Sequence, residues 1–162
     1  MKKIAVIVGS ESDKEQMEKG IEILKQFDIP YEFNVLSAHR DPDALHDYLG
    51  SLDEQVYSVI IAGAGMAAAL PGCVAAQTLL PVIGVPMSGG ALNGVDALYS
   101  IVQMPKGIPV GCMAIGASGA VNAAIYAARI MALSDGVLRK KLARHRESLK
   151  TGKQKSLPPS AA

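Results

Sequence analysis

Ile4-Ala5-Val6-Ile7-Val8-Gly9-Ser10-Glu11-Ser12-Asp13 joins an uninterrupted apolar run to a loop of glycine and polar residues. The run has the length and β-branched composition of a strand that is buried on both faces of a parallel sheet. Beyond the loop, apolar residues recur at helical spacing, which predicts an amphipathic helix over residues 13–27. This stretch therefore predicts a strand, a loop and a helix in direct succession.

The same alternation of strand and helix continues along the chain. Further strands are predicted at 31–36, 57–62, 81–86 and 108–115, and further helices at 42–50, 71–79, 98–104, 119–133 and 135–149. The pattern predicts an α/β protein, a single three-layer αβα domain whose doubly wound, five-stranded parallel sheet has flavodoxin-like order. We expect this domain to cover residues 1–150 and residues 151–162 to form a flexible tail.

Composition and charge describe a folded protein that does not bind nucleic acid. Hydrophobic residues make up 49% of the 162 residues and aromatic residues only 4%. Residues 1–138 carry eight basic and 14 acidic side chains, a net charge of −6, while the other eight basic residues gather in 139–155. Nucleic-acid binding needs basic side chains on the folded face with stacking aromatic rings beside them, and we expect no such partner.

The cysteines and the N-terminal apolar run indicate a cytoplasmic protein. Cys73 and Cys112 stand far apart among apolar neighbours and lack metal-ligand spacing, so we expect two buried, reduced thiols. Residues 4–8 are too few for a secretory or membrane segment. We therefore expect no membrane partner.

Two of the predicted loops carry side chains suited to an anionic substrate. The loop at 9–13 precedes a helix, whose free backbone amides and dipole favour a phosphate or carboxylate. Ser37-Ala38-His39-Arg40 follows the second strand and sets an imidazole beside a guanidinium. Because the carboxyl ends of parallel strands meet at one edge, the two loops are expected to lie together. An ordinary capped turn would account for the first loop equally well.

Two small-residue loops are predicted at the same edge. Gly63-Ala64-Gly65 and Ser88-Gly89-Gly90 follow the third and fourth strands and would let a ligand approach the backbone closely. Tight packing would explain each of them nearly as well alone. His46 and His145 lie on predicted helices without such neighbours, and we expect both to face solvent. No histidine has partners at metal-ligand spacing, so we expect no metal site.

Several longer motifs, in order along the chain, resemble one protein family. They are Gly9-Ser10-x-Ser12-Asp13, Ser37-Ala38-His39-Arg40, Ile61-Ala62-Gly63-Ala64-Gly65, Leu70-Pro71-Gly72, the run from Ala91 to Pro105, Gly107-Ile108-Pro109-Val110 and Asn122-Ala123-Ala124. Over about residues 3–135 the chain resembles the bacterial class I 5-(carboxyamino)imidazole ribonucleotide mutases of purine biosynthesis. That family is also known as the catalytic subunit of phosphoribosylaminoimidazole carboxylase.

The resemblance implies an isomerase that acts without cofactor, ATP or metal and assembles as a homo-octamer. Its reaction moves a carboxylate from the exocyclic nitrogen of the ribonucleotide to ring carbon 4 by decarboxylation and recarboxylation. His39 matches the family's catalytic histidine, and Asp13 would contact the ribose. The other implied substrate-binding residues are Ser10, Ser12 and Arg40 at the phosphate region, Ser37, Ala38 and Gly65 near the imidazole and carboxylate, and Ser88, Gly89, Ala91 and Leu92 after the fourth strand.

One loop departs from the family pattern, and two other functions stay open. Many members read Gly-Gly-Ala-Ala-His-Leu-Pro-Gly after the third strand, whereas this chain has Met66 at the second glycine and Ala69 at the histidine. The first alternative is the related direct carboxylase, which adds free carbon dioxide to aminoimidazole ribonucleotide. The second is a non-catalytic, flavodoxin-like ligand-binding domain, which the shortage of aromatic rings disfavours.

Overall fold

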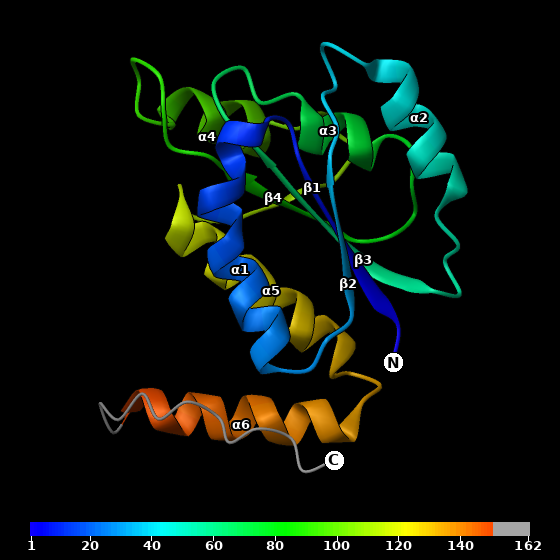
Figure 1. Ribbon diagram of the computed structural model, residues 1–162, viewed down its shortest axis with the longest axis vertical. Coiled ribbons are helices and arrows are strands. Elements are labelled where there is room, and N and C mark those ends of the chain that lie inside the picture. The colour runs from blue at the N-terminus through cyan, green and yellow to red at the C-terminus, as the bar shows by residue number, and fades with distance from the viewer. Residues whose placement is uncertain (151–162) are drawn as a thin grey trace.

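Five parallel strands form one sheet in the order β2-β1-β3-β4-β5 in the computed structural model, which describes residues 1–150 (Figure 1). The strands are β1 (Lys3–Val8), β2 (Tyr31–Val35), β3 (Tyr57–Ala64), β4 (Val82–Pro86) and β5 (Gly111–Cys112). The predicted α/β class and flavodoxin-like strand order are confirmed. The predicted tail, 151–162, lies outside the described residues.

Helices cover both faces of the sheet. They are α1 (Lys14–Gln26), α2 (Pro42–Ser51), α3 (Leu70–Ala75), α4 (Val95–Val102), α5 (Ala117–Met131) and α6 (Gly136–Lys150), with a short 3₁₀ helix, η1 (Glu11–Asp13), before α1. Helices α1 and α5 lie side by side on one face, and α2, α3 and α4 cover the other (Figure 1). No helix within residues 1–150 is both long and apolar enough to cross a membrane.

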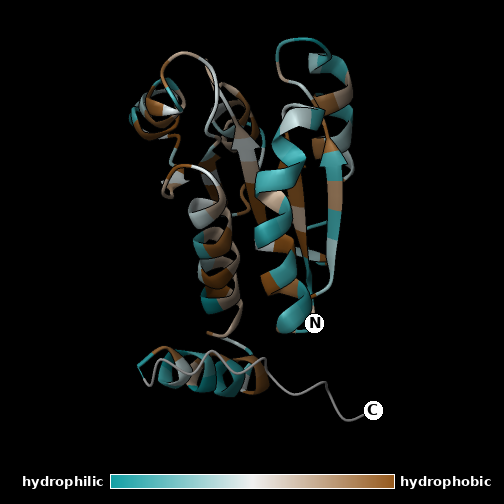
Figure 2. Ribbon diagram, turned by 60° about the vertical axis from the view of Figure 1, so that its left-hand side comes forward, coloured by the Kyte–Doolittle hydropathy of each residue, from teal (hydrophilic) through white to brown (hydrophobic). Residues whose placement is uncertain are grey.

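Strand β1 shows why both faces need cover. Ile4, Val6 and Val8 pack with residues of α1 and α5 in one core. Ala5 and Ile7 pack in a second core with residues of α2, α3 and α4. Because successive residues of a strand point to opposite faces, an uninterrupted apolar run is fully buried only if helices lie on both sides. Outside these cores, α1 is hydrophilic along its outer side (Figure 2).

Strand β5, which ends at Cys112, and helix α3 are much shorter than predicted, and the other elements agree within three residues at each end. Strand β5 begins at Gly111 rather than at residue 108, because Pro109 has no N–H to donate to a ladder. Helix α3 ends at Ala75 rather than at residue 79. There the side-chain Nε2 of Gln77 donates to the Cys73 carbonyl at 3.0 Å, which replaces the backbone bond of a further helical turn.

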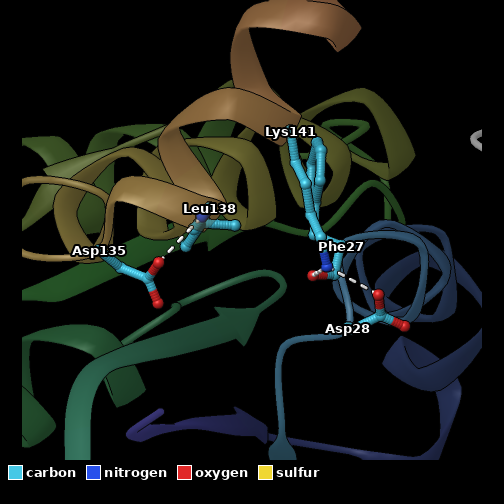
Figure 3. Close-up of polar contacts among 5 residues, drawn as sticks. All are labelled: Phe27, Asp28, Asp135, Leu138 and Lys141. Carbon is cyan, nitrogen blue, oxygen red and sulfur yellow. Dashed lines mark hydrogen bonds and ion pairs between the residues drawn. The ribbon is translucent and has the colours of Figure 1, made fainter. Parts of the chain in front are cut away.

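Helix α6 lies across the end of α1, where a few polar contacts hold it (Figure 3). The Asp135 carboxylate accepts a hydrogen bond from the Leu138 N–H at 2.9 Å and so caps α6, and Leu138 itself is fully buried. Lys141 Nζ donates to the Phe27 carbonyl at 3.0 Å and pairs with the Asp28 carboxylate at 2.7 Å. The lysine therefore satisfies acceptors at the C-terminal end of α1.

The predicted solvent exposure of the two helical histidines holds for His46 only. His46 is exposed, with its Nδ1 2.7 Å from Gln77 Oε1. His145 is half-buried instead, and its ring meets Phe27 edge-on with centroids 5.4 Å apart. The prediction for His145 was wrong because its packing partner lies far away in the sequence, at the end of α1.

The close packing of α1 on α5 depends on Gly20. A Cβ at this position would lie 2.6 Å from the Ala120 carbonyl oxygen. We expect Gly20→Ala to lower the free energy of unfolding by about 1–3 kcal/mol, although alanine favours a helix. Gly50→Ala on α2 is the matched control, since a Cβ there has no neighbour within 4 Å, and it should stabilise by about 0.5–1 kcal/mol. Urea unfolding measures both, and equal stability gains would refute the packing argument.

Candidate active site

The loops after β1, β2, β3 and β4 line a cavity of about 610 Å³ at the carboxyl edge of the sheet. This is where open parallel sheets bind ligands, and the volume suits a small molecule. The cavity brings together ten of the predicted residues: Ser10, Ser12, Asp13, Ser37, Ala38, His39, Arg40, Gly65, Ser88 and Gly89. Ala91 and Leu92 are exposed on the following stretch and do not line it, so their role stays a prediction.

The loop after β1 supplies an almost fully covered acid. Asp13 is 9% exposed, and its N–H donates to the Ser10 carbonyl at 3.1 Å. Its carboxyl makes no capping bond to α1. Burial raises the pKa of the Asp13 carboxyl. A hydrogen bond from the Ser10 backbone and the positive charge of Arg40 lower this pKa, but by less than burial raises it. Nearby, Ser12 Oγ donates to Ser10 Oγ at 3.1 Å.

Arg40 ties the loops after β1 and β2 together. Its Nη2 donates to the Gly9 carbonyl at 3.2 Å, and its Nε and backbone N–H donate to Ser37 Oγ at 3.3 and 3.2 Å. His39 lies between these anchored residues in the chain, is exposed, and lines the cavity. An imidazole on an anchored loop can exchange protons with a ligand held in the cavity.

The loop after β3 carries Met66 in a backbone conformation that favours glycine. Its φ is +50°, and its side chain lines the cavity and is 63% exposed. The methionine reaches toward the loop after β4, since a Cβ at Gly90 would lie 3.4 Å from Met66 Cγ. Ala69 also lines the cavity and offers no group for proton transfer. This wall of the cavity is therefore apolar.

We expect Met66→Gly to raise the free energy of unfolding by up to about 1 kcal/mol. A left-handed conformation costs an L-residue about 1–2 kcal/mol, and the greater freedom of unfolded glycine offsets about 0.5–1 kcal/mol of that gain. Met66→Ala is the control, because it removes the same side-chain atoms but keeps the Cβ. Chemical unfolding should show a gain for glycine alone. Equal gains for both variants would attribute the effect to the side chain rather than to the backbone.

Gln16 was missing from the predicted set and holds the loop after β4. Its Oε1 accepts hydrogen bonds from the Ser88 N–H at 3.0 Å and the Ser88 Oγ at 2.8 Å, and its Nε2 donates to the Ser88 carbonyl at 2.9 Å. Spacing alone places Gln16 one turn beyond Asp13 on the same face of the helix, but only the contact with Ser88, 72 residues away, shows its role. The remaining lining residues carry no polar signature: Gly9, Ala64, Met66, Ala67, Ala68, Ala69, Leu70 and Gly90.

The charged and titratable side chains of the cavity suit proton transfer on an anionic ligand. Asp13, His39 and Arg40 are the members of this kind among its lining residues. Within residues 1–150, no group of three or more His, Cys, Asp and Glu side chains is placed to hold a metal ion. The chemistry that these residues offer is therefore acid–base catalysis beside a binding site for negative charge.

Several curated proteins that are similar to this chain carry the same enzyme name. The N5-carboxyaminoimidazole ribonucleotide mutase of Escherichia coli K12 is 53% identical over 140 residues, which cover 86% of this chain and 83% of that protein. The enzyme of the same name from Bacillus subtilis is 51% identical over 147 residues, 91% of each chain.

A solved structure and a family model agree with these relatives. The crystal structure of Treponema denticola PurE superposes with a TM-score of 0.84 and 29% identity, over 94% of each chain. The model of the AIR carboxylase family matches residues 3–152 of this chain. This protein belongs to the AIR carboxylase family.

Proposed function

We propose that this protein is a 5-(carboxyamino)imidazole ribonucleotide mutase of purine biosynthesis, an isomerase. The observation that carries the proposal is sequence identity of 48–55% to curated enzymes named N5-carboxyaminoimidazole ribonucleotide mutase, over 80–93% of this chain. The cavity supports it, because its side chains offer one proton carrier and several anchors for an anionic nucleotide.

The reaction has two chemical halves and leaves the proton count unchanged. In the first half the bond between the exocyclic nitrogen and the carboxylate carbon breaks, and its electron pair stays on nitrogen, which takes a proton from His39. Carbon dioxide is released into the cavity. In the second half ring carbon 4 attacks the carbon dioxide, and His39 removes the hydrogen from that carbon, which restores the aromatic ring and the imidazolium.

Each loop has a distinct task in this proposal. Ser10, Ser12 and Arg40 bind the phosphate region, where hydroxyl and guanidinium donors suit an anion. Asp13 accepts hydrogen bonds from the ribose. The imidazole ring of the substrate and its migrating carboxylate lie against Ser37, Ala38 and Gly65. On the side of the loop after β4, the contacts come from Ser88, Gly89, Ala91 and Leu92.

The carbon dioxide has to stay in the cavity between the two halves. The wall at 64–70 is built of glycine, alanine, methionine and leucine, which offer little to hold water there. We propose that the reaction needs neither ATP nor a metal ion, as the resemblance implies. We also propose that the protein is cytoplasmic and assembles as a homo-octamer, as the resemblance implies.

A two-substrate absorbance assay without ATP or added metal tests the activity. One substrate is freshly generated 5-(carboxyamino)imidazole ribonucleotide, and the other is aminoimidazole ribonucleotide with limiting bicarbonate. We expect rapid formation of 4-carboxy-5-aminoimidazole ribonucleotide from the first substrate only. Turnover of the second at low bicarbonate would instead identify a direct carboxylase, and turnover of neither would refute both enzymatic functions.

A further inference from the structure

The carboxamide of Gln16 forms hydrogen bonds with both backbone polar groups of Ser88. It accepts from the Ser88 N–H and donates to the Ser88 carbonyl, at 3.0 and 2.9 Å, as a paired strand would. A third bond joins the Ser88 hydroxyl to the same Gln16 oxygen at 2.8 Å. Gln16 sits in the first turn of α1, so these bonds connect that helix to the loop after β4.

The loop after β4 leaves the buried core at Ser88. Met87, the residue before this loop, is buried, and its N–H donates to the Ala64 carbonyl at 2.9 Å. Ser88, Gly89 and Gly90 are exposed, and the two glycines have φ values of +151° and +65°. Glycine at such positions leaves a loop many alternative conformations, so a tether at Ser88 has a large effect on where the loop lies.

The surroundings of Gln16 are shaped to accept it. Behind the pair, a Cβ at Gly116 would lie 3.2 Å from Gln16 Oε1 and 3.4 Å from Ser88 Oγ. Gly116 itself is buried, and its N–H donates to the Pro86 carbonyl at 2.8 Å. The start of α5 therefore packs against the Gln16–Ser88 pair and restricts its movement.

The geometry points to Gln16 as a positioning residue for ligand binding, an inference that rests on the function proposed above. Gln16 does not line the cavity, whereas Ser88 and Gly89 do. Since Asp13 lies one turn before Gln16, the pair fixes the distance between the loop after β4 and the buried acid. The hydrogen bond to Gln16 Oε1 also uses the single proton of the Ser88 hydroxyl. The Ser88 hydroxyl can therefore only accept a hydrogen bond from a ligand.

Gln16→Met tests this role, because it keeps the length of the side chain and removes all three hydrogen bonds. We expect KM to rise by about tenfold or more, since ligand binding must then order the loop. The value of kcat should change by less than about threefold, because His39 stands on a different loop. Gln26→Met, at the far end of the same helix, is the matched control and should leave both constants unchanged.

Hydrogen exchange separates this inference from the proposed function. Gln16→Met should speed amide exchange in a peptide covering 87–91, and Gln26→Met should not, whether or not the wild-type protein turns over the proposed substrate. Ser88→Ala removes only the hydroxyl bond and should have a smaller effect than Gln16→Met in both measurements. Unchanged exchange in Gln16→Met, or a KM within twofold of the Gln26→Met value, would overturn the inference. Absence of wild-type turnover would overturn the proposed function instead.

Discussion

His39→Asn is expected to bind the ribonucleotide with near-wild-type affinity and to turn it over about 10²–10⁴ times more slowly. Asparagine resembles histidine in size and in hydrogen bonding, but it cannot carry a proton near neutral pH. The reaction needs one group that first gives a proton to nitrogen and then removes one from carbon. Among the described residues, His39 is the only one that brings an imidazole to the lining of the cavity. Steady-state kinetics measures turnover, and calorimetry with aminoimidazole ribonucleotide measures binding.

His46→Asn is the matched control for this result. His46 is exposed on α2, outside the cavity, and its contact to Gln77 is on the surface. The same substitution there should leave both turnover and binding unchanged. Near-normal turnover by His39→Asn would show that His39 does not carry the proton. Equal losses of turnover in both variants would show a general effect of replacing histidine.

Asp13→Asn is expected to weaken substrate binding by about 10–100-fold while making the folded protein more stable at neutral pH. A hydrogen bond to a charged acceptor is worth about 1.5–3 kcal/mol, which corresponds to that loss of affinity. The stability gain follows from burial, which disfavours the ionised form of the Asp13 carboxyl in the folded protein. The buried carboxylate of Asp13 destabilises the fold but serves binding. Its removal should therefore raise the free energy of unfolding while it lowers the affinity for substrate.

The pH dependence of this stability gain has a definite sign. The pKa of Asp13 in the folded protein is raised above its ordinary value of 3.8. At a pH between the ordinary pKa and the folded pKa, the unfolded chain therefore holds fewer protons than the folded protein. Wild-type stability therefore falls as the pH rises through this window, and the full penalty applies above the folded pKa. Asparagine does not titrate, so the variant's advantage should be absent below the ordinary pKa and grow above it. Urea unfolding from about pH 4 to about pH 8 measures it, and a gain independent of pH would contradict the burial argument.

Local patterns in the sequence predict most of the fold and most of the cavity. Apolar runs bounded by glycine and polar residues locate the strands, and the rule that parallel strands end at one edge brings His39 and Asp13 together. The features that sequence reasoning missed depend on contacts between distant segments. Gln16 acquires its importance only through Ser88, and His145 is covered only because α6 crosses the end of α1.

Individual residues explain the other differences. Pro109 is visible in the sequence, yet where β5 starts depends on its pairing with β4, which is a tertiary property. The backbone of Met66 could not be anticipated either, because a non-glycine residue with positive φ is uncommon and reflects constraints from the surrounding loop. Its side chain borders the cavity, where the family resemblance leads one to expect glycine.

The most direct test of the central claim follows the carboxylate carbon itself. The protein is given 5-(carboxyamino)imidazole ribonucleotide that is isotopically labelled in the carboxylate, in a buffer containing unlabelled bicarbonate, and the product is analysed by mass spectrometry. If the carbon dioxide stays in the cavity between the two halves of the reaction, nearly all of the product carries the label. A product whose label matches that of the bicarbonate pool would mean that carbon dioxide is taken from solution, and the protein would then be a direct carboxylase.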